Sequence, residues 1–113
     1  MPSIAFMAPI VPGKEDLDHS TLEEVQGDRR PEYEESRKRM RITREAVWHQ
    51  ETPNGTVAIV YIEADDVGAV MQGVATSQEP FDVWFRERLN EIHGFDLAEG
   101  GGTPPHQVAD IRL

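Results

Sequence analysis

Apolar and polar residues alternate most regularly near the middle of the chain, where two strand-like runs flank a turn signal. The runs cover residues 46–50 and 56–62, and Pro53, Asn54 and Gly55 separate them. Asn-Gly between two such runs favours a tight hairpin, because both central residues of that turn take positive φ. The pattern therefore predicts an antiparallel hairpin at the centre of the fold.

With Asn54 and Gly55 as the turn residues, residues that face each other across the hairpin have numbers of constant sum. The expected pairs are Trp48 with Tyr61, His49 with Val60, and Val47 with Ile62. One face then carries Val47, His49, Glu51, Ala58, Val60 and Ile62, and the other carries Trp48, Gln50, Val57, Ile59 and Tyr61. Neither face is plainly polar, so both need a cover. The chain's helices can cover one face and a second copy of the sheet the other, which predicts a homodimer.

The remaining periodic segments supply a strand and helices before and after the hairpin. The expected elements are a strand over 4–11, a helix over 14–26, a second helical piece from Pro31 to Met40, a short helix over 67–74 after an N-cap at 64–66, an amphipathic helix over 81–92 ending at Gly94, a loop over 100–105, and an edge strand over 108–113. The order is β, α, β, β, α, β, with the second helical layer split in two. It predicts one α+β domain over residues 1–113, with a four-stranded antiparallel sheet and helices on one side.

Composition excludes several classes of protein. The 113 residues carry a formal net charge of −10, which argues against a general nucleic-acid binder. No run approaches the roughly 20 apolar residues of a membrane span, and the absence of cysteine excludes disulfides and thiolate chemistry. The apolar start of the chain lacks a basic n-region and resembles a first strand more than a signal peptide. We therefore expect a cytoplasmic protein with no nucleic-acid or membrane partner.

Two stretches, VWHQETPNGTVAIVYIEADD and EPFDVWFRERLNEIHGFDL, resemble a family of small, functionally uncharacterised bacterial proteins. That family lies within the dimeric α+β barrel superfamily, which includes antibiotic-biosynthesis-monooxygenase-like and stress-responsive barrel proteins. The resemblance covers the chain from the first strand to Leu97 and implies ferredoxin-like subunits whose two sheets pack face to face. It supplies no reaction and no catalytic residue, because the superfamily holds oxygenases, haem-degrading enzymes, isomerases and binding proteins.

Two histidines are the candidates for proton transfer. His49 lies in mid-strand with Glu51 two residues along on the same face, so a carboxylate could orient its imidazole as a general base. The alternative is a hydrogen-bonded histidine at the boundary of the sheet. His93 lies in the last turn of a helix, where it could donate a proton or simply cap the helix as a cation.

Aromatic and basic side chains are the candidates for substrate binding. Trp48, Tyr61 and Trp84 could line an aromatic site, with Tyr61 as a proton donor, and Arg44 or Arg88 could bind a carboxylate. Each has a structural alternative: the aromatic residues as core, the arginines as ion-paired or snorkelling side chains.

No metal or cofactor is expected. The four histidines show no HxH or HExxH spacing, the triple glycine lacks the Lys-Ser/Thr of a phosphate loop, and no serine has a nucleophile-elbow context. The leading hypothesis is a small-molecule-binding homodimer, with oxidation or isomerisation of an aromatic or polyketide-like compound as the accompanying chemistry. The alternative is a non-catalytic dimeric accessory or stress-related protein.

Overall fold

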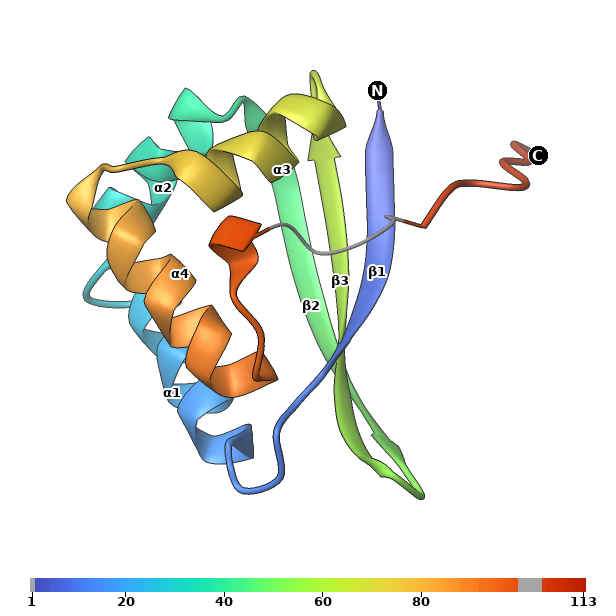
Figure 1. Ribbon diagram of the computed structural model, residues 1–113. Coiled ribbons are helices and arrows are strands. Elements are labelled where there is room, and N and C mark those ends of the chain that lie inside the picture. The colour runs from blue at the N-terminus through green and yellow to red at the C-terminus, as the bar shows by residue number, and fades with distance from the viewer. Residues whose placement is uncertain (1, 100–104) are drawn as a thin grey trace.

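A computed structural model describes residues 2–99 and 105–113 of the chain. A three-stranded sheet packs against four α-helices and one short 3₁₀ helix (Figure 1). In chain order the elements are β1 (Ser3–Pro9), α1 (Glu15–Gln26), α2 (Arg30–Arg39), β2 (Ile42–Thr52), β3 (Gly55–Ala64), α3 (Val67–Thr76), α4 (Pro80–His93) and η1 (Leu97–Glu99). The α+β class and the seven helices and strands expected up to Gly94 are confirmed.

The sheet is antiparallel throughout, with strand order β1-β3-β2. The central strand β3 pairs with β1 on one side and with β2, its hairpin partner, on the other. Strands β1 and β2 are therefore the two edges of the sheet among the described residues.

The hairpin is confirmed, but its expected register is wrong by two residues. Thr52 pairs with Gly55, so Pro53 and Asn54 form the turn, and the observed pairs are Trp48 with Ile59, His49 with Ala58, and Val47 with Val60. The hydroxyl of Thr52 fixes this turn, because it accepts from the Asn54 N–H at 3.2 Å and donates to the Gly55 carbonyl at 2.7 Å. Gly55 has φ +118°, a conformation that favours glycine. A shift of two residues leaves every side chain on its expected face.

The expected fourth strand over residues 108–113 is not formed, so the four-stranded, ferredoxin-like sheet is wrong for this chain. Residues 105–113 contain no strand and are all exposed. Alternating apolar residues form a strand only where a sheet edge and an apolar cover are both available. Helices α3 and α4 and the η1 helix that packs on them already cover one face of the sheet, and among the described residues no helix or strand covers the other. The loop expected at 100–105 lies mostly outside the described residues.

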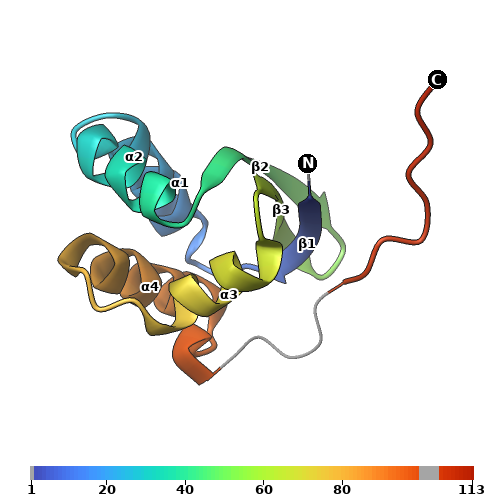
Figure 2. The same ribbon diagram turned by 90° about the horizontal axis from the view of Figure 1, so that it is seen from above.

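The four helices all lie on one side of the sheet, as Figures 1 and 2 show. The core contains three clusters of buried apolar residues, of which the first and third lie between the sheet and the helices and the second lies among α1, α2 and α4. Their buried members are Ile10, Ala58 and Ile92 in the first, Val25, Phe81 and Phe85 in the second, and Ile62, Ala64 and Val70 in the third. Tyr33 of α2 packs on the second cluster, and Met40, which follows α2, packs on the third.

A single residue determines where α3 begins, and another determines where α4 ends. The side chain of Asp66 caps α3 by accepting from the Ala69 N–H at 3.1 Å. Gly94 ends α4 with φ +73°, and a Cβ there would lie 2.9 Å from Cγ2 of Val11. Both ends agree with the sequence-based expectation.

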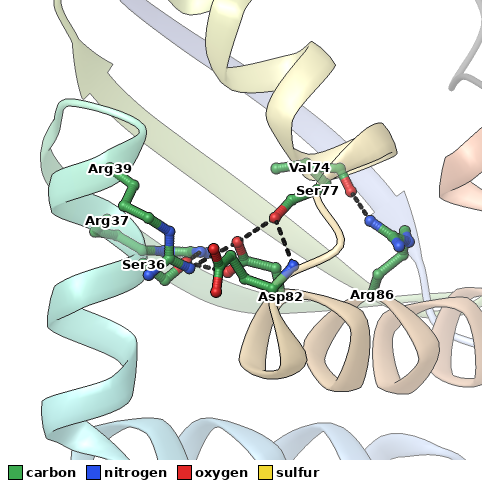
Figure 3. A network of polar contacts seen from close by, with 8 residues as sticks. Ser36, Arg37, Arg39, Val74, Ser77, Asp82 and Arg86 are labelled. Atoms are coloured by element: carbon green, nitrogen blue, oxygen red, sulfur yellow. Dashed lines mark hydrogen bonds and ion pairs between the residues drawn. The ribbon is translucent and has the colours of Figure 1, made fainter.

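Asp82 joins three segments of the helical layer through a buried polar network (Figure 3). Its carboxylate accepts from Ser36 of α2, from Arg39 of α2 at 2.8 Å, and from Ser77 before α4 at 2.6 Å. Burial opposes the charge of Asp82, but these hydrogen bonds and the Arg39 guanidinium outweigh it and lower the pKa of the carboxyl. Arg86, buried beside this network, donates to the Val74 carbonyl at 2.9 Å.

Replacement of Asp82 by asparagine should destabilise the fold by about 2 kcal/mol at pH 7, a value discounted for the partial exposure of Arg39. The folded-state pKa of Asp82 lies below its ordinary 3.8, so the ionised carboxylate stabilises the fold above that pH. That contribution disappears as the pH falls through the folded-state pKa, so the difference between the two proteins should shrink below about pH 4. Urea denaturation between pH 7 and pH 3 measures it.

Glu79→Gln is the matched control, because Glu79 is an exposed carboxylate three residues from Asp82. It should change the free energy of unfolding by less than about 0.5 kcal/mol. A difference between wild type and Asp82→Asn that stays constant down to pH 3 would contradict a stabilising ionised Asp82.

Candidate functional site

His49 lies on the helix side of β2 and contacts two residues of α1. Its Nε2 is 2.5 Å from Oδ2 of Asp18, whose side chain is buried. The ring of His19 meets the His49 ring edge-on, with centroids 4.9 Å apart and an interplanar angle of 88°. We call Asp18, His19 and His49 the histidine cluster.

The histidine cluster contains a histidine oriented by a carboxylate. An ionised Asp18 can only accept, so the N–H at Nε2 of His49 donates, and the ring orientation is fixed by that bond. The sequence predicted that Glu51 would orient His49, but Asp18 does so instead. Glu51 is exposed and lies opposite Thr56 near the hairpin turn.

Sequence reasoning missed Asp18, although one signal was present. Asp18, Thr21 and Val25 are the buried residues of α1, at the spacing of one helix face. A carboxylate on an otherwise inward-facing stripe needs a polar partner, and His49 on the covered face of the hairpin is such a partner.

Among the described residues no helix or strand covers the other face of the sheet, and residues 105–109 approach it only near Ser3, Ala5 and Tyr61. We call it the open face. It consists of Ser3, Ala5, Met7 and Pro9 of β1, Arg44, Ala46, Trp48 and Gln50 of β2, and Val57, Ile59, Tyr61 and Glu63 of β3.

The open face is ordered in rows across the three strands. Met7, Ile59 and Trp48 form one continuous row, and Met7 and Trp48 are 69% and 53% exposed. Ala5, Tyr61 and Ala46 form the next row. Large apolar side chains that lie side by side and exposed are unusual on a monomer surface and are typical of interaction or binding sites.

Tyr61 is the main polar group within this apolar surface. Its hydroxyl donates to Glu63 at 2.8 Å, and the Arg44 guanidinium lies 5.6 Å from the ring centroid. The hydrogen bond to Glu63 raises the pKa of the Tyr61 hydroxyl, so it keeps its proton at neutral pH. Because its single O–H already donates to Glu63, the Tyr61 hydroxyl oxygen is left to accept a hydrogen bond from a ligand donor.

A hollow of about 330 Å³ lies between the open face and the C-terminal segment. It is lined by Ser3, Ile4, Ala5 and Tyr61 from the sheet and by residues 105–109, which include His106. Figure 2 shows this segment on the side of the sheet away from the helices. Its volume lies at the lower end of the range of small-molecule sites, and its walls combine apolar and polar side chains.

The predicted site residues do not come together in one place. His49 faces the helices, whereas Tyr61 and Trp48 belong to the open face. A proton relay between His49 and Tyr61 would have to cross the sheet.

The remaining candidates have structural contacts. Nδ1 of His93 lies 2.9 Å from the Pro9 carbonyl oxygen, and its ring stacks on Phe95. Trp84 lies in the helical layer between two guanidinium groups, at 4.0 Å from Arg29 and 5.1 Å from Arg88.

Comparison of the chain with protein-family models, with curated proteins and with solved structures finds no match. Among the described residues, no group of three or more histidine, aspartate or glutamate side chains is arranged to hold a metal ion. Within the same part of the chain, no helix is long and apolar enough to cross a membrane.

The histidine cluster should show coupling between Asp18 and His49. His49→Ala and Asp18→Ala should each cost about 2 kcal/mol, because each leaves a poorly solvated polar group without its partner. The double variant should cost at least about 1 kcal/mol less than the sum. Urea denaturation of the four proteins measures this cycle.

His19→Ala serves as the control, since exposed His19 makes only a ring contact with His49. It should cost less than about 1 kcal/mol. Additive effects of His49→Ala and Asp18→Ala, within about 0.5 kcal/mol, would show that the contact does not stabilise the fold.

Proposed function

We propose that this protein binds a small apolar or aromatic molecule on the open face, between two copies of the chain packed sheet against sheet. The observation that carries the proposal is the row Met7, Ile59 and Trp48, which lies uncovered beside the hollow at Tyr61. Such packing would give a dimeric α+β barrel, which is also the architecture that the resemblance in the sequence implies.

The charge of the open face supports a second copy as its cover. The chain carries a net charge of −10, which opposes association of like molecules. Among the positions of the open face, Arg44 and Glu63 are the charged residues, and they lie directly opposite each other at one end. The rest of the face is neutral, so two copies can meet there without burying a like-charged pair.

The ligand class follows from the walls of the hollow and from its polar groups. Ala5 and Val108 offer apolar contact, while the Tyr61 hydroxyl oxygen and the His106 imidazole offer hydrogen bonds. A compact molecule with an aromatic or apolar body and one or two hydroxyl groups fits this chemistry. The proposal does not include proton transfer between His49 and Tyr61, because the sheet separates them.

A non-catalytic dimeric accessory protein is the second candidate. It is favoured by the engagement of His49 with Asp18 and of His93 with the Pro9 carbonyl, since both histidines already have partners within the chain. The two candidates share the dimer and differ in whether the open face takes up a ligand.

The full chain should be a dimer by native mass spectrometry and by sedimentation analysis. Met7→Glu should weaken the dimer at least tenfold, because it places a charge in the apolar centre of the interface. It should leave the stability of the single chain almost unchanged, since the Met7 side chain is mostly exposed. Ala69→Glu, at an exposed position of α3 on the opposite side of the molecule, is the matched control and should leave the dimer intact.

A neutral aromatic dye such as Nile red should bind the dimer and quench Trp48 fluorescence in a Trp84→Phe background, which leaves Trp48 as the sole tryptophan. Tyr61→Phe should weaken the binding of a hydroxyl-bearing probe such as 1-naphthol several-fold by removing the oxygen that accepts from the probe, without affecting the dimer. A dimer that takes up neither probe supports the accessory protein, and a chain that stays monomeric at high concentration refutes both candidates.

A further inference from the structure

The C-terminal segment 105–113 carries apolar side chains that are left exposed by the part of the chain that the structure describes. Val108, Ile111 and Leu113 are 88%, 79% and 117% exposed relative to a reference residue. Along an extended strand, Ala109, Ile111 and Leu113 would share one side, and Val108, Asp110 and Arg112 the other. This alternation is typical of an edge strand with one side buried. Among the described residues no sheet buries that side.

The segment lies near a sheet edge that lacks a partner. Strand β1 pairs only with β3 among the described residues, so its outer backbone groups are unpaired within the sheet. Residues 105–109 line the hollow together with Ser3, Ile4 and Ala5 of β1. Beyond that point the segment leads away from the domain, and Leu113 lies far from the sheet (Figures 1 and 2).

We infer that segment 105–113 is an exchanged arm, which adds as a strand to the free β1 edge of a second copy of this chain and lays Ile111 and Leu113 on it. The inference rests on the dimer of the proposed function and adds to it the element that joins the two copies. Each copy then donates one arm and receives one.

Symmetry favours the β1 edge as the receiving site. Residues 105–109, at the start of the arm, lie beside Ser3, Ile4 and Ala5 of β1 in their own chain, and Figure 2 shows the arm on the side of the open face. A two-fold axis that passes close to β1 would place the partner's β1 next to it. The arm of one chain would then lie near β1 of the other. The arm would otherwise stand between two open faces, so transfer to the partner also frees the face for packing.

Charge and area agree with a second copy as the occupant. The side chains of Asp110 and Arg112 cancel in charge, so the arm is as neutral as the face that it approaches. Three strands about 4.8 Å apart and about 24 Å long give a face of only ~340 Å² in projection. A stable interface removes about 800 Å² of accessible surface from each partner, so even a rough sheet face needs an added element. Two exchanged arms supply it.

The absence of cysteine allows a direct test by cross-linking. One chain carries Ile111→Cys and a second, mass-tagged chain carries Ser3→Cys on β1. The two are mixed, incubated to exchange subunits, and treated with a short bifunctional thiol reagent. The expected product is a covalent heterodimer of one tagged and one untagged chain, which forms only when the arm of one copy lies on β1 of the other.

Two controls define what overturns the inference. Ala69→Cys on α3 replaces Ser3→Cys as the negative control and should give no more than background heterodimer. A chain carrying both Ile111→Cys and Ser3→Cys should give linked dimers. If it gives only internally linked monomers while the protein is dimeric, the arm folds back on its own chain and the exchange is refuted.

The arm's contribution to assembly separates this inference from the proposed function. Deletion of residues 105–113, or Ile111→Asp, should weaken the dimer at least tenfold while urea denaturation of the dilute single chain is unchanged. Arg112→Gln adds the same unit of negative charge on the polar side of the arm and should alter dimer affinity less than threefold. A wild-type dimer whose affinity survives the deletion refutes the arm alone, whereas a monomeric wild type refutes the dimer as well.

Discussion

The structure depends on β3, which pairs with β1 and β2 along most of its length and so divides the molecule into a covered and an uncovered side. Ala58 and Ile62 of this strand are buried under the helices, whereas Ile59 and Tyr61 point the other way. Polar groups of the covered side must find partners inside the layer, and they do: Asp18 with His49, and Glu45 with Arg37 at 2.9 Å. The uncovered side has no such demand, and its central row of Met7, Ile59 and Trp48 is apolar. That row is the surface on which binding is proposed.

Much of the fold could be predicted because local pattern and tertiary structure agree. Three features are each specified by residues close together in the sequence: the helix end at Gly94, the cap at Asp66 and the hairpin. The hairpin register was missed because the hydroxyl of Thr52 fixes a turn at Pro53 and Asn54, a side-chain effect that the Asn-Gly signal hides. The fourth strand was predicted wrongly because alternating apolar residues show only that a segment could bury one side. They do not show whether the same chain provides a sheet edge and an apolar cover for it.

The candidate site was less predictable, since it depends on which elements meet. His49 was identified from its strand position, but its acid comes from α1, 31 residues earlier in the chain, and not from Glu51 on the same strand. Side chains alternate between the two faces along a strand, so the sequence already placed Trp48 and Tyr61 on one face and His49 on the other. That division separates residues which side-chain chemistry alone had grouped as a single active site.

The acidity of the chain and its proposed self-association are compatible because they act over different distances. At physiological ionic strength a surface charge is screened within about 8 Å, so the net charge affects the approach of two copies more than their contact. The free energy of the contact itself depends on the side chains that are buried at the interface. Burial of apolar area stabilises it by about 25 cal/mol per Å². On the open face the charges of Arg44 and Glu63 face each other at one end, and the central row contains none. The acidic residues elsewhere then oppose non-specific aggregation of a protein that exposes Met7 and Trp48, and they leave the neutral face as the place where a second copy can pack.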